Sequence, residues 1–307
     1  METAEIHCPT CRQGRLTRLG YSGFSSWAES REVSELCALS GPLYLCKDCD
    51  LIFRWPRPDN QSLERAYRSI PVNSWSNARP AYWALIGDLI RKHASNENIL
   101  DIGCFRGDFL AFCGDRYRAF GVEPNPAAAE FAQSRGIAMV GRDINDDLSM
   151  YNGQFGAIIL MDVLEHVPDP LATLRTVRPL LAPAGIVVVL TGDSGYWLAR
   201  MSQPFYWYMS FPIHLVYLSR RFIRWAAANA SYQVIAYERV AHDPESFRRR
   251  LKKTAKALVV AIAKKARGGH CKWICSIRPF STFSESIEPP RFPELPDHMI
   301  AALKVEG

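Results

Sequence analysis

The chain has 307 residues, of which 48% are hydrophobic and 22% are charged, and its formal net charge is +6. This composition is ordinary for a soluble globular protein, and the length allows one main domain with a small appendage. The first residues show no basic segment leading into an apolar run, and no stretch of about 18 apolar residues occurs. These features predict a cytoplasmic protein without a membrane span.

The nine cysteines are an odd number in a chain that shows no secretion signal. A reduced compartment, with thiols used as metal ligands or as small buried groups, is therefore expected rather than a disulfide framework. Four of them form two Cys-x-x-Cys pairs, Cys8 with Cys11 and Cys46 with Cys49. Each pair can direct two thiolates at one tetrahedral metal, which predicts a structural zinc site; four unligated thiols are the alternative.

The order of patterns along the chain predicts three regions and a tail. Residues 1–58 hold the cysteine pairs and short strand-like runs, and they form the predicted zinc-binding module. Residues 59–95 show a helical pattern and serve as a linker region. Residues 96–280 form the predicted main domain, and the Pro- and Glu-rich residues 281–307 form the tail.

Short apolar strands and helices alternate within the main domain, which predicts a doubly wound, mostly parallel, seven-stranded α/β sheet. The predicted strands are 99–102, 119–122, a third ending near 140, 157–160, 186–190, 233–240 and 272–277. The predicted helices are 108–113, 127–135, 171–181 and 220–229, followed by a basic helix at 245–267.

A ligand-binding turn is predicted where the first of these strands ends. The strand runs into Asp101-Ile102-Gly103-Cys104-Phe105-Arg106-Gly107-Asp108, in which glycines allow a ligand to approach the backbone before the next helix. Glu123 ends the second strand, where an acid can accept hydrogen bonds from ribose hydroxyls. A nicotinamide site is disfavoured, because this turn lacks the Gly-x-Gly-x-x-Gly spacing.

With these residues the chain resembles the class I S-adenosylmethionine-dependent methyltransferases, in their small-molecule branch. The turn resembles the family motif Asp-x-Gly-x-Gly-x-Gly, although Phe105 stands where the family usually has glycine. The segments that extend the resemblance are Val122-Glu123-Pro124, Asp143-Ile144, residues 155–170 (FGAIILMDVLEHVPDP), residues 180–190 (LLAPAGIVVVL), Pro212-Ile213-His214 and Tyr217-Leu218-Ser219. Cysteine knuckles also precede the methyltransferase core in some sugar and natural-product methyltransferases.

The resemblance implies S-adenosylmethionine as cofactor and assigns its contacts. Gly103, Cys104 and Gly107 would face the methionine part, with Asp101 near its amino group. Glu123 would hold the ribose, Asp143 and Ile144 would flank the adenine, and Met161 and Asp162 would close the pocket.

Two histidines are candidates for the base that an acceptor hydroxyl would require. His166 follows Glu165, which is a further catalytic candidate, at the carboxyl end of the fourth strand, and His214 lies in the loop after the fifth. Either could instead order its loop without taking a proton. Some quinone-ring methyltransferases with a similar motif are thought to use this acid and histidine with a divalent metal, but the sequence offers too few further ligands to predict one.

The expected acceptor is a small molecule or glycan and not nucleic acid, since the fourth-strand motif is Met161-Asp162-Val163 rather than Asn-Pro-Pro-aromatic. Residues 192–218 are rich in aromatic side chains, which predicts a lid over the acceptor or, equally, a small hydrophobic subdomain.

The basic helix predicts a solvated face or a weak membrane-surface contact. A non-catalytic scaffold is the alternative function, suggested by Phe105, and the oligomeric state stays open.

Overall fold

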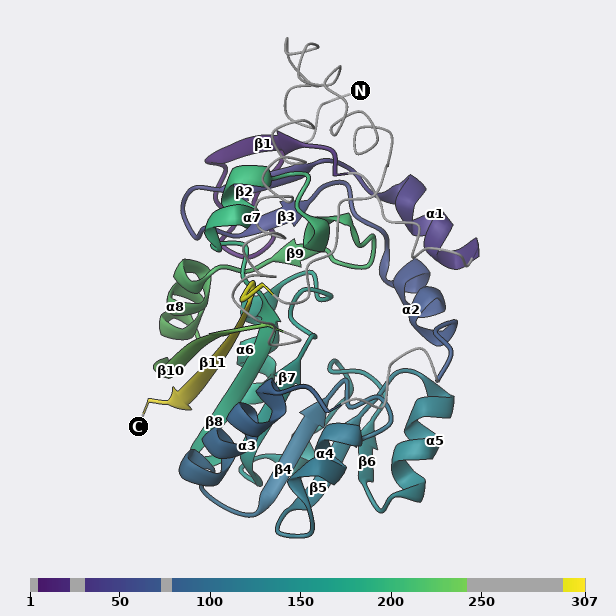
Figure 1. The fold of residues 1–307 in the computed structure, drawn as a ribbon, viewed down its shortest axis with the longest axis vertical. Coiled ribbons are helices and arrows are strands. Elements are labelled where there is room, and N and C mark those ends of the chain that lie inside the picture. Colours follow the sequence, from purple (N-terminus) through teal and green to yellow (C-terminus); the bar gives the residue numbers. More distant parts are fainter. Residues whose placement is uncertain (1–4, 23–30, 73–78, 242–294, 307) are drawn as a thin grey trace.

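The computed structural model describes residues 5–22, 31–72, 79–241 and 295–306, which build two β-sheets with flanking helices (Figure 1). The strands are β1 Leu16–Gly20, β2 Leu43–Cys46, β3 Ile52–Arg54, β4 Asn98–Ile102, β5 Arg118–Val122, β6 Ala138–Gly141, β7 Phe155–Met161, β8 Leu181–Gly192, β9 Val216–Tyr217, β10 Tyr232–Val240 and β11 His298–Val305. The α-helices are α1 Arg31–Leu39, α2 Asn60–Arg68, α3 Tyr82–His93, α4 Asp108–Cys113, α5 Pro126–Ser134, α6 Pro170–Val177, α7 Trp197–Ser202 and α8 Arg220–Asn229.

The larger sheet has seven strands in the order β10-β11-β8-β7-β4-β5-β6. The strands β6, β5, β4, β7 and β8 run parallel, whereas β11 runs antiparallel to both of its neighbours, β8 and β10. The predicted doubly wound, mostly parallel seven-stranded sheet is confirmed. Its carboxyl edge, where β4, β5 and β7 end, collects the predicted cofactor residues.

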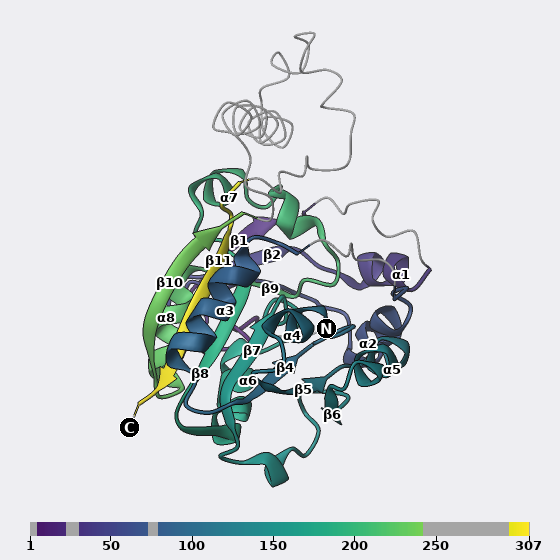
Figure 2. The same cartoon turned by 60° about the horizontal axis from the view of Figure 1, so that its bottom comes forward.

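Helices cover both faces of this sheet, and the strand sequences show why. Successive side chains of a strand point to opposite faces, so a strand covered on both sides is apolar throughout. In β8, Val187 and Val189 pack in one buried cluster with α6 and α8, whereas Ile186, Val188 and Leu190 pack in another with α3 and α4. Figure 2 shows α3 lying along the sheet beside β8.

The smaller sheet has the antiparallel order β1-β2-β3-β9. Three of its strands come from the predicted module at residues 1–58, but β9 comes from the loop after β8. Figure 1 shows this sheet beyond the end of the large sheet toward which β7 and β8 run. The module is therefore joined to the main domain by backbone pairing as well as by its chain connection.

Two predictions differ from the structure, and two others lie outside the described residues. The predicted tail is wrong for residues 298–305, because β11 lies between β8 and the edge strand β10 of the large sheet and its residues from Met299 to Leu303 are almost fully buried. The predicted helix at 171–181 ends earlier, at Val177, and a short 3-10 turn follows over Arg178–Leu180. The basic helix 245–267 and the strand 272–277 lie outside the described residues.

Within the part of the chain that the structure describes, no helix is both long enough and apolar enough to cross a bilayer.

Candidate cofactor and acceptor site

Asp101 and the turn after β4 form the centre of the predicted cofactor site. The Asp101 side chain is 2% exposed, and its Oδ1 has no hydrogen-bond partner within the described residues. Burial, with a contribution from Glu123, raises the pKa of Asp101 well above its usual value. A buried carboxylate oxygen without a partner is costly in a folded protein, which indicates a missing polar ligand.

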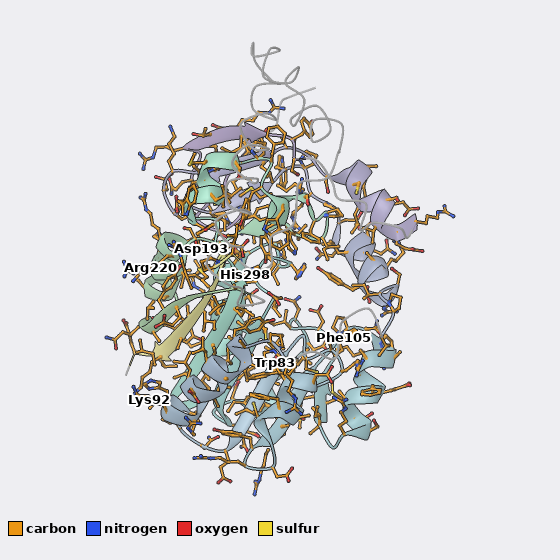
Figure 3. All side chains as sticks on the ribbon, viewed as in Figure 1. Trp83, Lys92, Phe105, Asp193, Arg220 and His298 are labelled. Carbon is orange, nitrogen blue, oxygen red and sulfur yellow. The ribbon has the colours of Figure 1, made fainter. Side chains whose placement is uncertain are left out.

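The backbone of this turn is left-handed at both of its glycines. Gly103 and Gly107 have φ values of +75° and +69°. A Cβ at Gly107 would lie 1.9 Å from Ile137 Cδ1, so no larger residue fits there without a shift. Phe105 also adopts a left-handed conformation, with φ of +46°, which glycine adopts readily and which strains a phenylalanine. Figure 3 places Phe105 at the edge of the large sheet that faces the small one.

Glu123 stands at the end of β5, next to this turn, and is 5% exposed. Its Oε2 accepts a hydrogen bond of 2.8 Å from the backbone N–H of Phe105, and its Oε1 accepts one of 2.8 Å from Asn125. Burial raises the pKa of Glu123, and these two N–H groups lower it in part. Each carboxylate oxygen has a second lone pair, so the group can accept further bonds from ribose hydroxyls.

The other predicted cofactor residues lie along the same edge. Asp143 is exposed after β6 and accepts hydrogen bonds from Asn145, while Ile144 packs against the core. At the end of β7, Met161 packs on the other core cluster, and Asp162 has φ of +53°. Burial, followed by the nearby charge of Glu165, raises the pKa of Asp162 to about 7.

Glu165, His166 and His214 come together beside the end of β7. The centroids of the two imidazole rings lie 4.8 Å apart, and the rings pack edge to face. His166 Nδ1 lies 3.1 Å from the Ile213 carbonyl and His214 Nδ1 lies 3.1 Å from the Tyr208 carbonyl. A carbonyl only accepts, so both Nδ1 atoms carry the hydrogen, and each Nε2 is the basic nitrogen.

Glu165 is almost fully buried and acts as an acceptor for several groups. Its carboxylate accepts from Thr191 Oγ1 at 2.9 Å and from the Tyr208 hydroxyl, and its carbonyl accepts from the N–H groups of Leu215 and Val216. Glu165, His166 and His214 offer ligand atoms within 4.8 Å of one another, so they could hold a metal. The hydrogen bonds of Glu165 to Thr191, Tyr208, Leu215 and Val216 also connect the end of β8 to the loop that follows it, which is a structural role.

The aromatic run at 192–218 supplies core as well as site residues. Tyr206, Trp207 and Tyr208 are buried in one cluster with Leu43 and Ile52 of the small sheet. This burial supports the hydrophobic-subdomain interpretation for these three residues. Burial also raises the pKa of Tyr208 well above its usual value, so its hydroxyl stays protonated and donates to Glu165.

Sequence reasoning missed a buried pair at the start of β11. His298 Nδ1 lies 2.8 Å from Asp297 Oδ1, and Asp297 Oδ2 accepts from Tyr206 and from Trp207 Nε1. Burial alone would lower the pKa of His298. The carboxylate of Asp297, with smaller contributions from Asp162 and Glu165, has the larger effect, so the pKa of His298 is raised. Adjacent Asp and His are a signal for such a pair, but they lay in residues interpreted as a tail.

The four cysteines of the predicted zinc module do meet. Cys8 Sγ lies 3.6 Å from Cys49 Sγ, and Cys11 Sγ lies 3.5 Å from Cys46 Sγ. All four sulfur atoms lie within 4.8 Å of one another. The bond from the neighbouring Cys49 thiol lowers the pKa of Cys8 to about 6. Four converging thiols from two knuckles are the donor set of a structural zinc site.

Comparison with known proteins agrees with this geometry. A family model described as a methyltransferase domain matches residues 74–237, which is more than half of the chain. The chain belongs to this methyltransferase family. The family and the site together support S-adenosylmethionine as the cofactor.

Curated relatives match over shorter regions. A ubiquinone biosynthesis O-methyltransferase of Escherichia coli O127:H6 is 33% identical over 103 residues, which cover 31% of this chain and 42% of that protein. The enzyme of the same name from Cereibacter sphaeroides is 34% identical over 99 residues, which cover 30% of this chain and 40% of that protein. The chain thus spans less than half the length of these relatives.

Similar solved structures are more distant. A possible histamine N-methyltransferase from Thermotoga maritima has a TM-score of 0.45 and 15% identity, with 73% of this chain and 89% of that chain covered. A geranyl diphosphate C-methyltransferase from Streptomyces coelicolor has a TM-score of 0.46 and 18% identity, with 79% of this chain and 86% of that chain covered.

Proposed function

We propose that this methyltransferase-family protein is an enzyme that transfers a methyl group from S-adenosylmethionine to a hydroxyl of a small-molecule or glycan acceptor. The observation that carries the proposal is the pair of buried carboxylates at the ends of β4 and β5. Asp101 has an oxygen that no described group satisfies, and Glu123 lies beside it at the glycine turn. This arrangement suits a ligand with a cationic amine and a ribose.

The bound cofactor would supply a methyl group activated on a sulfonium, and the residues of the chain would hold it in place. Asp101 would bind the ammonium of the methionine part, Glu123 the ribose hydroxyls, and Asp143 with Ile144 the adenine. The turn at Gly103, Cys104 and Gly107 would lie against the methionine part, with Met161 and Asp162 closing the pocket. Alignment and exclusion of water are what such a displacement chiefly requires.

His166 and His214 are the candidate bases for the acceptor hydroxyl. Burial, followed by the charge of His166, lowers the pKa of His214 well below its usual value, so this imidazole is neutral near pH 7. A neutral imidazole whose Nδ1 is held on a carbonyl can take a proton at Nε2, and the lowered pKa makes His214 a weaker base than an ordinary histidine. The curated relatives named O-methyltransferases support an oxygen acceptor here.

The cofactor part of the proposal is tested by calorimetric titration of the purified protein with S-adenosylhomocysteine. We expect micromolar binding that Asp101→Ala and Glu123→Ala each weaken by about tenfold or more. Glu130→Ala is the matched control, because Glu130 is exposed on α5 and should change nothing. A wild-type protein that does not bind would instead favour the non-catalytic scaffold that Phe105 suggested.

We also propose that Cys8, Cys11, Cys46 and Cys49 hold a structural zinc ion. Metal analysis of the purified protein should find about one zinc per chain, as four thiolates make one tetrahedral site. Cys46→Ser should lose most of the metal, whereas Cys37→Ser, which changes a half-buried thiol outside the cluster, should keep it. Equal metal content in both variants would contradict the site.

A further inference from the structure

The small sheet depends on a strand from the main domain. In the antiparallel pair of β3 and β9, Ile52 faces Tyr217 and Phe53 faces Val216. The backbone N–H of Arg54 continues this ladder with a hydrogen bond of 3.0 Å to the Leu215 carbonyl. The cysteine module and the segment at 206–219, which we call the acceptor-side segment, therefore share one sheet.

Arg54 fixes this junction with its side chain. It is 1% exposed, and its guanidinium donates to the carbonyls of Gly41 and Met209 and to the hydroxyls of Ser22 and Tyr217, at 2.9 to 3.2 Å. Two of these acceptors belong to the module and two to the acceptor-side segment. The planar fork of arginine suits several acceptors in fixed directions, which a lysine ammonium does not reproduce.

Asp50 makes a second link, directly after the last cysteine of the cluster. Its backbone N–H donates to the carbonyl of Cys46 at 3.0 Å, so its position follows that of the knuckle. Its Oδ2 accepts from Ser219 Oγ at 2.5 Å and from Arg200. Ser219 is also the N-cap of α8, so this contact fixes the end of the acceptor-side segment.

The acceptor-side segment carries Tyr208 and His214. Tyr208 donates its hydroxyl to Glu165 and accepts at its carbonyl from His214, and the N–H groups of Leu215 and Val216 bond the Glu165 carbonyl. A continuous set of contacts thus leads from the cysteine knuckles through Arg54 and Asp50 to the two candidate bases. The cofactor residues Asp101, Gly103 and Glu123, by contrast, are placed by β4, β5 and the turns that follow them.

We infer that the metal-loaded cysteine module is the acceptor-side wall of the site, and that Arg54 and Asp50 are positioning residues that hold Tyr208 and His214 against Glu165 and His166. The module then acts on the acceptor half of the site and not on the cofactor half. This inference rests on the proposed function for its meaning, but its contacts can be tested without a known acceptor.

The test compares Arg54→Lys, Asp50→Asn and the chelator-treated wild type with the untreated full-length protein. Nitrogen-15 spectra of labelled histidines, assigned with His166→Gln and His214→Gln, report the bond from His214 Nδ1 to the Tyr208 carbonyl. We expect the His214 signals to shift or broaden in all three samples. S-adenosylhomocysteine affinity, measured by calorimetry, should stay within about threefold of the untreated protein. Arg31→Ala, which removes an exposed cation on α1 of the same module, is the control for both readouts.

The outcomes separate this inference from the proposed function. Unchanged His214 signals in all three samples would overturn the inference, because the module would then not position the segment. A parallel loss of cofactor affinity of tenfold or more would also overturn it, since the module would then support the whole site. If the untreated wild type binds no S-adenosylhomocysteine, the proposed function fails, while the histidine signals still test the contacts.

Discussion

Gly107 is limited both by its backbone conformation and by the space around it. Its φ is +69°, and a Cβ would lie 1.9 Å from Ile137 Cδ1. Gly153, with φ of +71°, has the same conformation, but apart from its chain neighbours no atom of the described residues would lie within 4 Å of a Cβ there. Both Gly→Ala variants should lose about 1 kcal/mol of unfolding free energy from backbone strain.

Gly107→Ala should lose a further 1 to 3 kcal/mol or so, since Ile137 must move. Urea unfolding of the two variants beside the wild type gives this difference directly. Equal losses in Gly107→Ala and Gly153→Ala would show that Ile137 yields without cost, and that the turn is looser than the structure indicates.

Asp162 should make the stability of the cofactor-free protein depend on pH. Its pKa is about 7 in the folded protein against 3.8 for the ordinary side chain. The folded state binds the Asp162 proton more tightly than the unfolded state does. Protonation of Asp162 therefore stabilises the fold fully below about pH 4, and this stabilisation is lost as the pH rises through about 7. Asp162→Asn removes the ionisable group, and asparagine tolerates the φ of +53°.

We expect the variant's gain in unfolding free energy over the wild type to be larger at about pH 8 than at about pH 6, by roughly 1 kcal/mol. Urea unfolding at the two pH values measures it, with Asp115→Asn as an exposed control. A gain that is the same at both values would mean that Asp162 does not titrate in this range.

At the scale of elements, β11 and the aromatic segment are joined by one buried carboxylate. Asp297 lies just before β11 and accepts from Tyr206, Trp207 and His298. Asparagine at position 297 would have only one side-chain oxygen, so its N–H₂ group would face one of these three donors and could not accept its hydrogen bond. Asp297→Asn should therefore lose about 2 to 4 kcal/mol of unfolding free energy.

Tyr206→Phe removes one of these bonds and leaves the carboxylate in place, so it should lose only about 1 kcal/mol by the same measurement. If both variants lose equal amounts, the charge of Asp297 is not what stabilises the junction.

The elements of the parallel sheet could be predicted from sequence because each carries a local signal. Apolar runs bounded by turn residues marked β7 and β8, and the stretch predicted as a helix at 108–113 is α4. Local pattern could not show pairings between distant residues. The two-residue strand β9 has no periodicity of its own, and β11 pairs with β8 only because the tertiary fold brings it there.

The candidate site likewise has one part that a local sequence pattern predicts and another part that depends on contacts between distant residues. The cofactor turn and Glu123 are read from one stretch of chain, so their placement at adjacent strand ends followed from the motif. The contacts of Tyr208 with Glu165 and of His298 with Asp297 need loops whose course no local pattern gives. Likewise, Arg54 gave no sign in the sequence that it would be buried between two regions.

At the scale of the whole molecule, the two sheets share one core. A single buried cluster contains Cys8, Cys46 and Phe53 of the module together with Leu164 and Phe222 of the main domain. Structures that share a core lose it together, so the metal-loaded protein should unfold in one cooperative transition.

Far-ultraviolet circular dichroism and tryptophan fluorescence should therefore give the same urea midpoint. Trp207 is a useful reporter, because it is buried between the small sheet and Asp297. Two separate transitions would mean that the cysteine module folds independently. Arg54 and Asp50 would then stabilise the docking of the module on the main domain but not the fold of the large sheet.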